Sequence, residues 1–108
     1  MILIRKYLLN HGANVNLEFS GITPLMYAVA YQNHEIVKEL INHKADVNSV
    51  SSDQQTALTF AIKGRDKKAL QLLVNNGADP SLKIHDNYTA IDLGKEENIQ
   101  EILEVLNI

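Results

Sequence analysis

Apolar residues fall in short runs with helical spacing, and these runs recur at a fixed interval along the chain. Three runs begin directly after Thr23, Thr56 and Thr89, which stand 33 residues apart. Their apolar or small side chains recur every three or four positions, as on one face of an α-helix: Leu25, Ala28 and Val29; Leu58, Ala61 and Ile62; Ile91 and Gly94. A second run follows each of them, through Ile36, Val37, Leu40 and Ile41; Ala69, Leu70, Leu73 and Val74; Ile99, Ile102, Leu103 and Leu106. The pattern predicts stacked repeats, each containing a pair of helices.

Polar residues suited to helix capping stand before each predicted helix. Each of the three threonines can accept a hydrogen bond from a free backbone N–H of the first turn. Pro24 occupies a first helical position, where it needs no N–H. The second helices follow a polar break, and their predicted caps are Asn33, Asp66 and Asn98. Asn98 has Glu101 three residues later, which is the spacing of a capping box.

Helix ends and the loops between units require left-handed backbone. The residue just after a helix often takes this conformation, to which glycine is best suited. Gly12 and Gly77 hold that position in two units, and Lys44 holds it in the middle one, so we expect Lys44 to be strained. About ten residues then lead to the next threonine, with a turn residue two positions before it, and we predict protruding hairpins around Gly21, Gln54 and Asn87.

Composition limits the classes of function. The chain has 108 residues, 45% of them apolar, and a net charge of −3 from 10 basic and 13 acidic residues. This balance disfavours a nucleic-acid surface. The absence of cysteine excludes a disulfide framework, a thiolate metal site and a cysteine nucleophile. The apolar start of the chain is too short to span a membrane and lacks signal-peptide architecture, so we expect no membrane insertion and a cytoplasmic location.

Several motifs suggest chemistry that their context argues against. His34-Glu35 begins like a zinc-protease motif, but Lys38 stands where the second histidine is required. The pattern at Asn87-Tyr88-Thr89 is a glycosylation sequon, although a turn and a helix cap account for the same residues. A basic cluster could contact phosphate, yet it is short and interrupted by Asp66: Lys63, Arg65, Lys67 and Lys68. We expect no metal, no cofactor, no small-molecule substrate and no catalysis.

Two phrases carry a resemblance to a known family. Thr23-Pro24-Leu25 and Gly77-Ala78-Asp79, set within a 33-residue unit of two helices and a hairpin, resemble the ankyrin repeat. The resemblance implies an all-α repeat fold, an ankyrin-like solenoid of antiparallel helix pairs with protruding hairpin loops. It divides a single domain, 1–108, into a half repeat and three further units: 1–16, 17–48, 49–81 and a C-terminal capping repeat, 82–108.

The same resemblance implies a noncatalytic module that binds a protein or peptide on the concave surface of hairpins and first helices. Register and residue chemistry together give the candidate partner-binding residues Phe19, Ile22, Tyr31, Lys63, Arg65, His85 and Tyr88. The aromatic and aliphatic members suit interface hot spots, and the two cations suit a charged rim for a partly acidic partner. Two alternatives stay open. Phe19 and Ile22 could simply pack the first hairpin, with Tyr31 covering a helix end, and the chain could be a regulatory or structural segment of a larger enzyme or channel.

Overall fold

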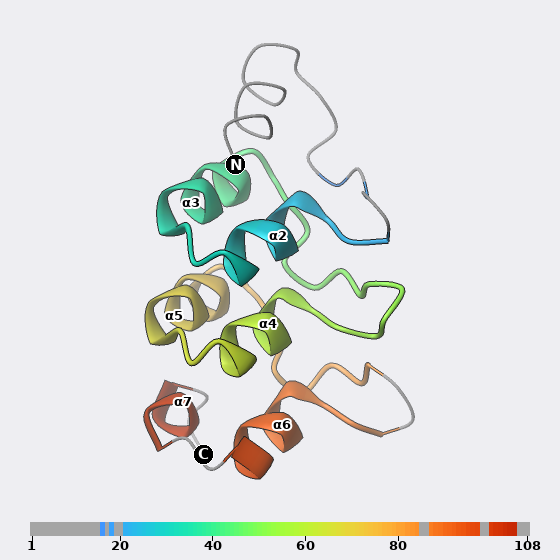
Figure 1. Ribbon diagram of the computed structural model, residues 1–108, viewed down its shortest axis with the longest axis vertical. Coiled ribbons are helices and arrows are strands. Elements are labelled where there is room, and N and C mark those ends of the chain that lie inside the picture. Colours follow the sequence, from blue (N-terminus) through green and yellow to red (C-terminus); the bar gives the residue numbers. More distant parts are fainter. Residues whose placement is uncertain (1–15, 17, 19–20, 85–86, 98–99, 106–108) are drawn as a thin grey trace.

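The computed structural model describes residues 16, 18, 21–84, 87–97 and 100–105, and within them the chain forms helices in consecutive pairs (Figure 1). The helices are α2 (Pro24–Ala30), α3 (His34–Asn42), α4 (Ala57–Lys63), α5 (Lys67–Asn75), α6 (Ala90–Glu97) and α7 (Gln100–Val105). The first helices of the pairs, α2, α4 and α6, stack in one layer, and the second helices, α3, α5 and α7, stack in another. This arrangement confirms the predicted all-α repeat fold.

The capping threonines start the first helices as predicted. Thr23 Oγ1 accepts a hydrogen bond from the N–H of Met26 at 3.3 Å, and Pro24 stands at the start of α2. In α4 the bond is reciprocal, because Thr59 Oγ1 also accepts from the N–H of Thr56 at 2.8 Å. The same exchange joins Thr89 and Asp92 at the start of α6. The third residue after each threonine therefore decides whether the cap becomes a capping box.

The second helices begin at Asn33 and Asp66, again as predicted. Asn33 Oδ1 accepts from the N–H of Ile36 at 3.2 Å, and Asp66 Oδ1 accepts from the N–H of Ala69 at 3.2 Å. The predicted cap at Asn98 lies outside the described residues. The short turns before these helices contain left-handed residues that the sequence did not indicate, at Gln32 (φ 58°) and Arg65 (φ 53°).

The ends of α3 and α5 have the predicted left-handed residue. Lys44 has φ 71° and Gly77 has φ 96°. The next residue closes each helix in the same way: the N–H of Ala45 donates to the Leu40 carbonyl at 3.0 Å, and the N–H of Ala78 donates to the Leu73 carbonyl at 2.9 Å. These are Schellman-type ends. Lys44 therefore carries a side chain where the backbone favours glycine, and the equivalent Gly12 lies outside the described residues.

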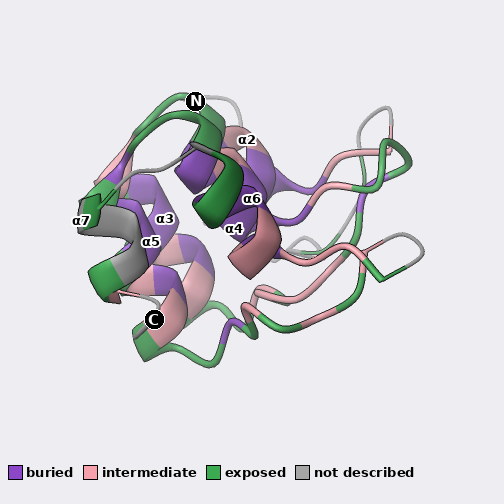
Figure 2. Cartoon of the chain, turned by 90° about the horizontal axis from the view of Figure 1, so that it is seen from below, coloured by how far each residue is buried: buried purple, intermediate pink, exposed green. Residues whose placement is uncertain are grey.

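The core lies between the two helix layers, where buried residues of both face one another (Figure 2). Every residue expected on the inner faces of α2 and α4 is buried, as are most of those on α3 and α5. Ile91 differs, being only half-buried at the position where Leu25 and Leu58 are enclosed. In α6 the buried apolar residues are instead Ala90 and Leu93.

The loops between pairs extend away from the layer of first helices (Figures 1 and 2). Gly21 (φ 78°) is left-handed, as its turn position predicted, and Gln54 (φ 60°) is left-handed too, although glutamine suits such a position less well than glycine or asparagine. In the second loop the N–H of Ser51 donates to the Gln55 carbonyl at 2.7 Å, which closes a hairpin-like turn. Adjacent loops also touch, since the N–H of Ser52 donates to the Gly21 carbonyl at 3.2 Å. A side chain on Gly21 would collide with Ser52, so glycine is needed there for space as well as conformation.

Candidate protein-interaction surface

The structure separates the predicted site residues into two places. Ile22 and Tyr88 stand directly before a capping threonine, at the base of a loop, and both are half-buried. Three others are exposed and lie near the turns that join the helices of a pair: Tyr31, Lys63 and Arg65. Phe19 and His85 lie outside the described residues.

In two units, the residue directly before the capping threonine contacts the end of the first helix. We call this residue the loop-base position. Lys63 Nζ donates to Gln55 Oε1 at 3.0 Å, and the Tyr88 hydroxyl donates to Glu96 Oε2 at 2.6 Å. Residues 55 and 88 are one repeat apart, and so are residues 63 and 96. The repeat therefore places two side chains together here without fixing their chemistry, and in the first unit the same positions hold Ile22 and Ala30.

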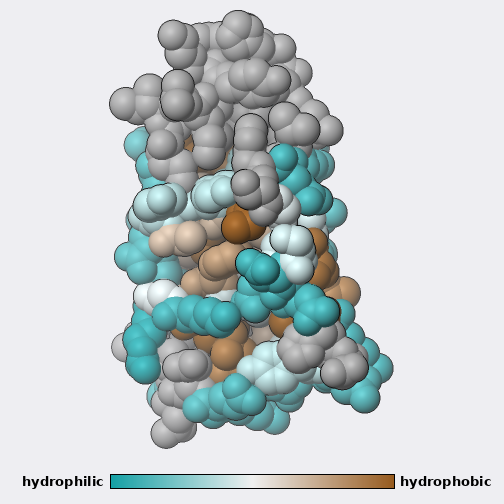
Figure 3. All heavy atoms as spheres, turned by 45° about the vertical axis from the view of Figure 1, so that its right-hand side comes forward, coloured by the Kyte–Doolittle hydropathy of each residue, from teal (hydrophilic) through white to brown (hydrophobic). Residues whose placement is uncertain are grey.

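Tyr31 presents the largest exposed hydrophobic side chain among the described residues. It is 73% exposed at the C-terminal end of α2. Figure 3, which brings the loop side of the molecule forward, shows hydrophobic residues gathered along the middle of this face with hydrophilic residues on both sides. An apolar band with a polar margin is the usual arrangement of a protein-binding surface.

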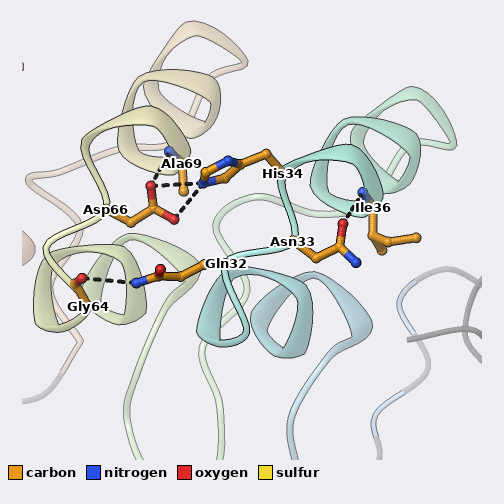
Figure 4. A network of polar contacts seen from close by, with 7 residues as sticks. All are labelled: Gln32, Asn33, His34, Ile36, Gly64, Asp66 and Ala69. Carbon is orange, nitrogen blue, oxygen red and sulfur yellow. Dashed lines mark hydrogen bonds and ion pairs between the residues drawn. The ribbon is translucent and has the colours of Figure 1, made fainter.

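The helix–helix turns of neighbouring repeats are joined by side chains, as Figure 4 shows. Gln32 Nε2 donates to the Gly64 carbonyl at 3.1 Å. His34 Nε2 lies 2.7 Å from Asp66 Oδ2 and 2.9 Å from Oδ1, while Asp66 also caps α5. Asp66 is buried and His34 is partly exposed. The network fixes the two turns against each other, and Tyr31 is the residue directly before Gln32 in the first of these turns.

Asparagine side chains also join successive repeats, on a different part of the molecule. Asn16 Oδ1 accepts from the N–H of Asp46 at 2.7 Å, and Asn48 Oδ1 accepts from the N–H of Asp79 at 2.7 Å. Asn48 Nδ2 also donates to the Gly77 carbonyl at 3.1 Å. The recurring Val-Asn pair, at residues 15–16 and 47–48, is the sequence signal for this ladder. These bonds hold successive repeats together, so the asparagines belong to the scaffold.

The described residues offer little for metal or acid–base chemistry. Within the described ranges, no three histidine, aspartate or glutamate side chains are grouped to hold a metal ion. His34 pairs with Asp66 of the next repeat. Hydrogen bonds from the hydroxyl and backbone N–H of Ser81 lower the pKa of Asp79, which is a local turn interaction. None of the described helices is both long and apolar enough to cross a membrane.

Comparison with known proteins decides the family. The family model for ankyrin repeats in three copies matches residues 2–84. The chain belongs to the ankyrin-repeat family. Ankyrin repeats are protein-interaction modules and in general have no catalytic activity of their own. The helix pairs, the capping threonines and the protruding loops are thus those of an ankyrin solenoid.

Similar ankyrin-repeat sequences occur in proteins of very different size. Over 98 residues, 90% of the chain, it is 34% identical to alpha-latrocrustotoxin-Lt1a of Latrodectus tredecimguttatus. Over 77 residues, 69% of the chain, it is 40% identical to the human transient receptor potential cation channel subfamily A member 1. The chain spans only 7% of the length of each. It is also 30% identical, over 99% of its length, to a putative ankyrin repeat protein of Acanthamoeba polyphaga mimivirus, of which it spans 70%.

Proposed function

We propose that this ankyrin-repeat chain is a noncatalytic module that binds a protein or peptide on the surface formed by the loop bases and the first helices. The proposal rests on two positions of the repeat, the residue before the capping threonine and the residue at the end of the first helix, whose side chains meet. The same contact is made by different residues in two units: Gln55 with Lys63, and Tyr88 with Glu96. Scaffold positions, such as the capping threonines, instead keep their chemistry from unit to unit. Residues that the fold leaves free to vary can specify a partner.

Residue chemistry supports the same surface. Tyr31 is a large aromatic side chain held at 73% exposure, with no core role that would explain it. Ile22 adds a half-buried aliphatic side chain in the same repeat. Aromatic side chains dominate binding energy at interfaces, and charged residues usually form the rim around them. Lys63 and Arg65, both exposed, can form such a rim in the next repeat.

The test is affinity capture from a lysate of the source cell with a triple variant, Ile22→Ser, Tyr31→Ser and Tyr88→Ser. We expect the triple variant to lose partners that the native chain captures. Ile22 and Tyr88 are half-buried, so circular dichroism must show that the triple variant is folded. The single variant Tyr31→Ser changes an exposed residue and should not disturb folding. Lys38→Ser is the control, because Lys38 is exposed on α3, a second helix, whereas the proposed surface is formed by loop bases and first helices. Retention of every partner by the folded triple variant would contradict the proposal.

A second possibility is that these repeats act within a larger protein, such as a channel or an enzyme, and contact their own chain. The first two relatives favour it, because the chain matches only 7% of their length. The coding sequence on both sides of this segment tests the idea directly. If further domains are encoded, cross-linking mass spectrometry on the full-length protein should join Tyr31 or Lys63 to one of them. Cross-links only to other proteins would favour the first proposal.

A further inference from the structure

Four exposed cations crowd the turn between α4 and α5. Lys63 ends α4, Arg65 lies in the turn, and Lys67 and Lys68 are the first two residues of α5. We call these four residues the cationic turn. Among the described residues, Lys63 donates to a neutral amide, that of Gln55, and no described carboxylate forms an ion pair with these cations.

The one carboxylate within this stretch is already committed. Asp66 is buried, caps α5 through the N–H of Ala69, and lies 2.7 Å from His34 Nε2 of the preceding repeat. It points into the contact between the two turns, as Figure 4 shows. The Asp66 carboxylate therefore interacts with groups inside the fold, and the exposed surface of the turn remains basic.

Two of the cations, Lys67 and Lys68, stand where they are unfavourable for the helix that carries them, whereas Lys63 is in the last turn of α4, where a cation is favourable. The N-terminus of a helix has a partial positive charge, so acidic residues stabilise its first turn and lysines oppose it. In α3 the corresponding positions hold His34 and Glu35, whereas in α5 they hold Lys67 and Lys68. Nothing in the packing requires this, since both lysines are exposed. A basic surface that weakens its own helix suggests a use outside the fold.

An exposed tyrosine stands one residue before the side chain that joins the preceding turn to this one. Tyr31 ends α2 in the preceding repeat, and its neighbour Gln32 donates to the carbonyl of Gly64 between Lys63 and Arg65. The two turns are thus side by side (Figure 4). An exposed aromatic residue in the turn that adjoins clustered cations suits a partner segment in which an aromatic or aliphatic side chain is flanked by carboxylates. Tyrosine and arginine are also the residues most often found at interface hot spots.

We infer that the cationic turn binds an acidic segment of a partner protein, with an apolar side chain of that segment resting on Tyr31. The inference rests on the proposed function and names the chemistry of its partner. A nucleic acid fits less well, because a phosphate chain continuing along the repeats would meet the last unit. Residues 82–108 hold two lysines against six carboxylates. A short acidic peptide needs only the turn itself.

Fluorescence anisotropy with a defined probe tests this inference. The probe is a short fluorescein-labelled peptide of glutamate and aspartate with one central phenylalanine. The double variant Lys67→Glu and Lys68→Glu should bind it about tenfold more weakly, because two attractive charges become repulsive. Lys83→Glu is the matched control: it is an exposed lysine in a loop of another repeat, and its change should alter affinity by less than about twofold.

The aromatic part of the inference has its own readout. Replacing the phenylalanine of the peptide by serine should weaken binding to the native chain by about threefold. The same replacement should have no effect on binding to Tyr31→Ser. Folding is controlled by thermal unfolding, since Lys67→Glu and Lys68→Glu place acidic residues at the start of α5 and should raise the melting temperature. Lost binding with raised stability cannot come from unfolding.

Three results of the anisotropy measurements would overturn the inference. The native chain could fail to bind the peptide; Lys83→Glu could weaken binding as much as the double variant; or an oligothymidylate of equal charge could bind more tightly than the peptide, which would indicate nucleic acid. The proposed function is tested separately by the capture experiment. If partners are lost by the triple serine variant but kept by the double glutamate variant, the interaction surface stands and the acidic-partner inference fails.

Discussion

Lys44 offers a direct test of how this fold treats a side chain in the wrong backbone conformation. It follows α3 with φ 71°, in the left-handed region. Its N–H donates to the Ile41 carbonyl and the next N–H donates to Leu40, so the helix end holds the conformation in place. The exposed Lys44 side chain has no hydrogen bond or ion pair with other described residues. Lys44→Gly should therefore remove backbone strain without removing a side-chain interaction with the described residues.

The expected gain follows from two opposing terms. A left-handed conformation costs a residue with a Cβ roughly 1–2 kcal/mol. Glycine loses more backbone freedom on folding, which takes back about 0.5–1 kcal/mol. The free energy of unfolding should thus rise by about 0.5–1 kcal/mol. For a domain of this size such a gain corresponds to roughly 2–8 °C in the melting temperature, measured by far-UV circular dichroism and checked by urea unfolding.

The chain supplies both controls for this experiment. Gly77 is the equivalent residue of the next repeat, with φ 96° and open space where a Cβ would be. Gly77→Lys should therefore lower stability by about as much as Lys44→Gly raises it, through conformation alone. Lys38→Gly, in the exposed middle of α3, should destabilise by about 1 kcal/mol. An unchanged or lower melting temperature for Lys44→Gly would refute the reasoning.

Four further predictions concern contacts within and between repeats. In urea unfolding, Asn33→Ala should cost about 1 kcal/mol as a lost cap, and Asp66→Ala about 2 kcal/mol or more, because it also leaves His34 without its partner. Asn48→Ala removes both bonds to the next repeat and should cost about 1–3 kcal/mol. Bonds from Ser81 lower the pKa of Asp79 below 3.8, so the stability they provide is present at neutral pH and lost as the pH falls through the lowered value. Ser81→Ala should return the Asp79 pKa toward 3.8 in an NMR titration, and an unshifted pKa would contradict this.

The parts of the fold that depend on neighbouring residues could be predicted from the sequence. The caps at Thr23 and Asn33, for example, need only a suitable side chain three residues before the N–H that it accepts from. The left-handed Lys44 followed from register alone, by its equivalence to Gly77. The left-handed turn before α5 could not be found in this way. Gly64 stands in that turn with φ −83°, while Arg65 has φ 53°, so the left-handed residue is not the glycine.

Contacts between repeats were missed because they require the units to be superposed in space. His34 and Asp66 are 32 residues apart, and neither carries a local motif for the other. The candidate site was predicted only in part for the same reason. Register placed Ile22 and Tyr88 at equivalent loop bases, as the structure has them. It gave no sign that Tyr88 bonds Glu96, because that contact depends on how the loop folds back onto α6.

The loop bases and the start of α5 differ in their effect on the stability of the fold. At the loop bases, Gln55 with Lys63 and Tyr88 with Glu96 each satisfy their polar groups within the repeat, so variation there is nearly neutral for stability. At the start of α5, Lys67 and Lys68 oppose the helix dipole and have no carboxylate partner in the described part of the chain. Selection for stability alone explains the first arrangement and not the second. A repeat array can carry such a local cost because its stability is a sum over units and interfaces, and the well-capped neighbouring repeats offset it.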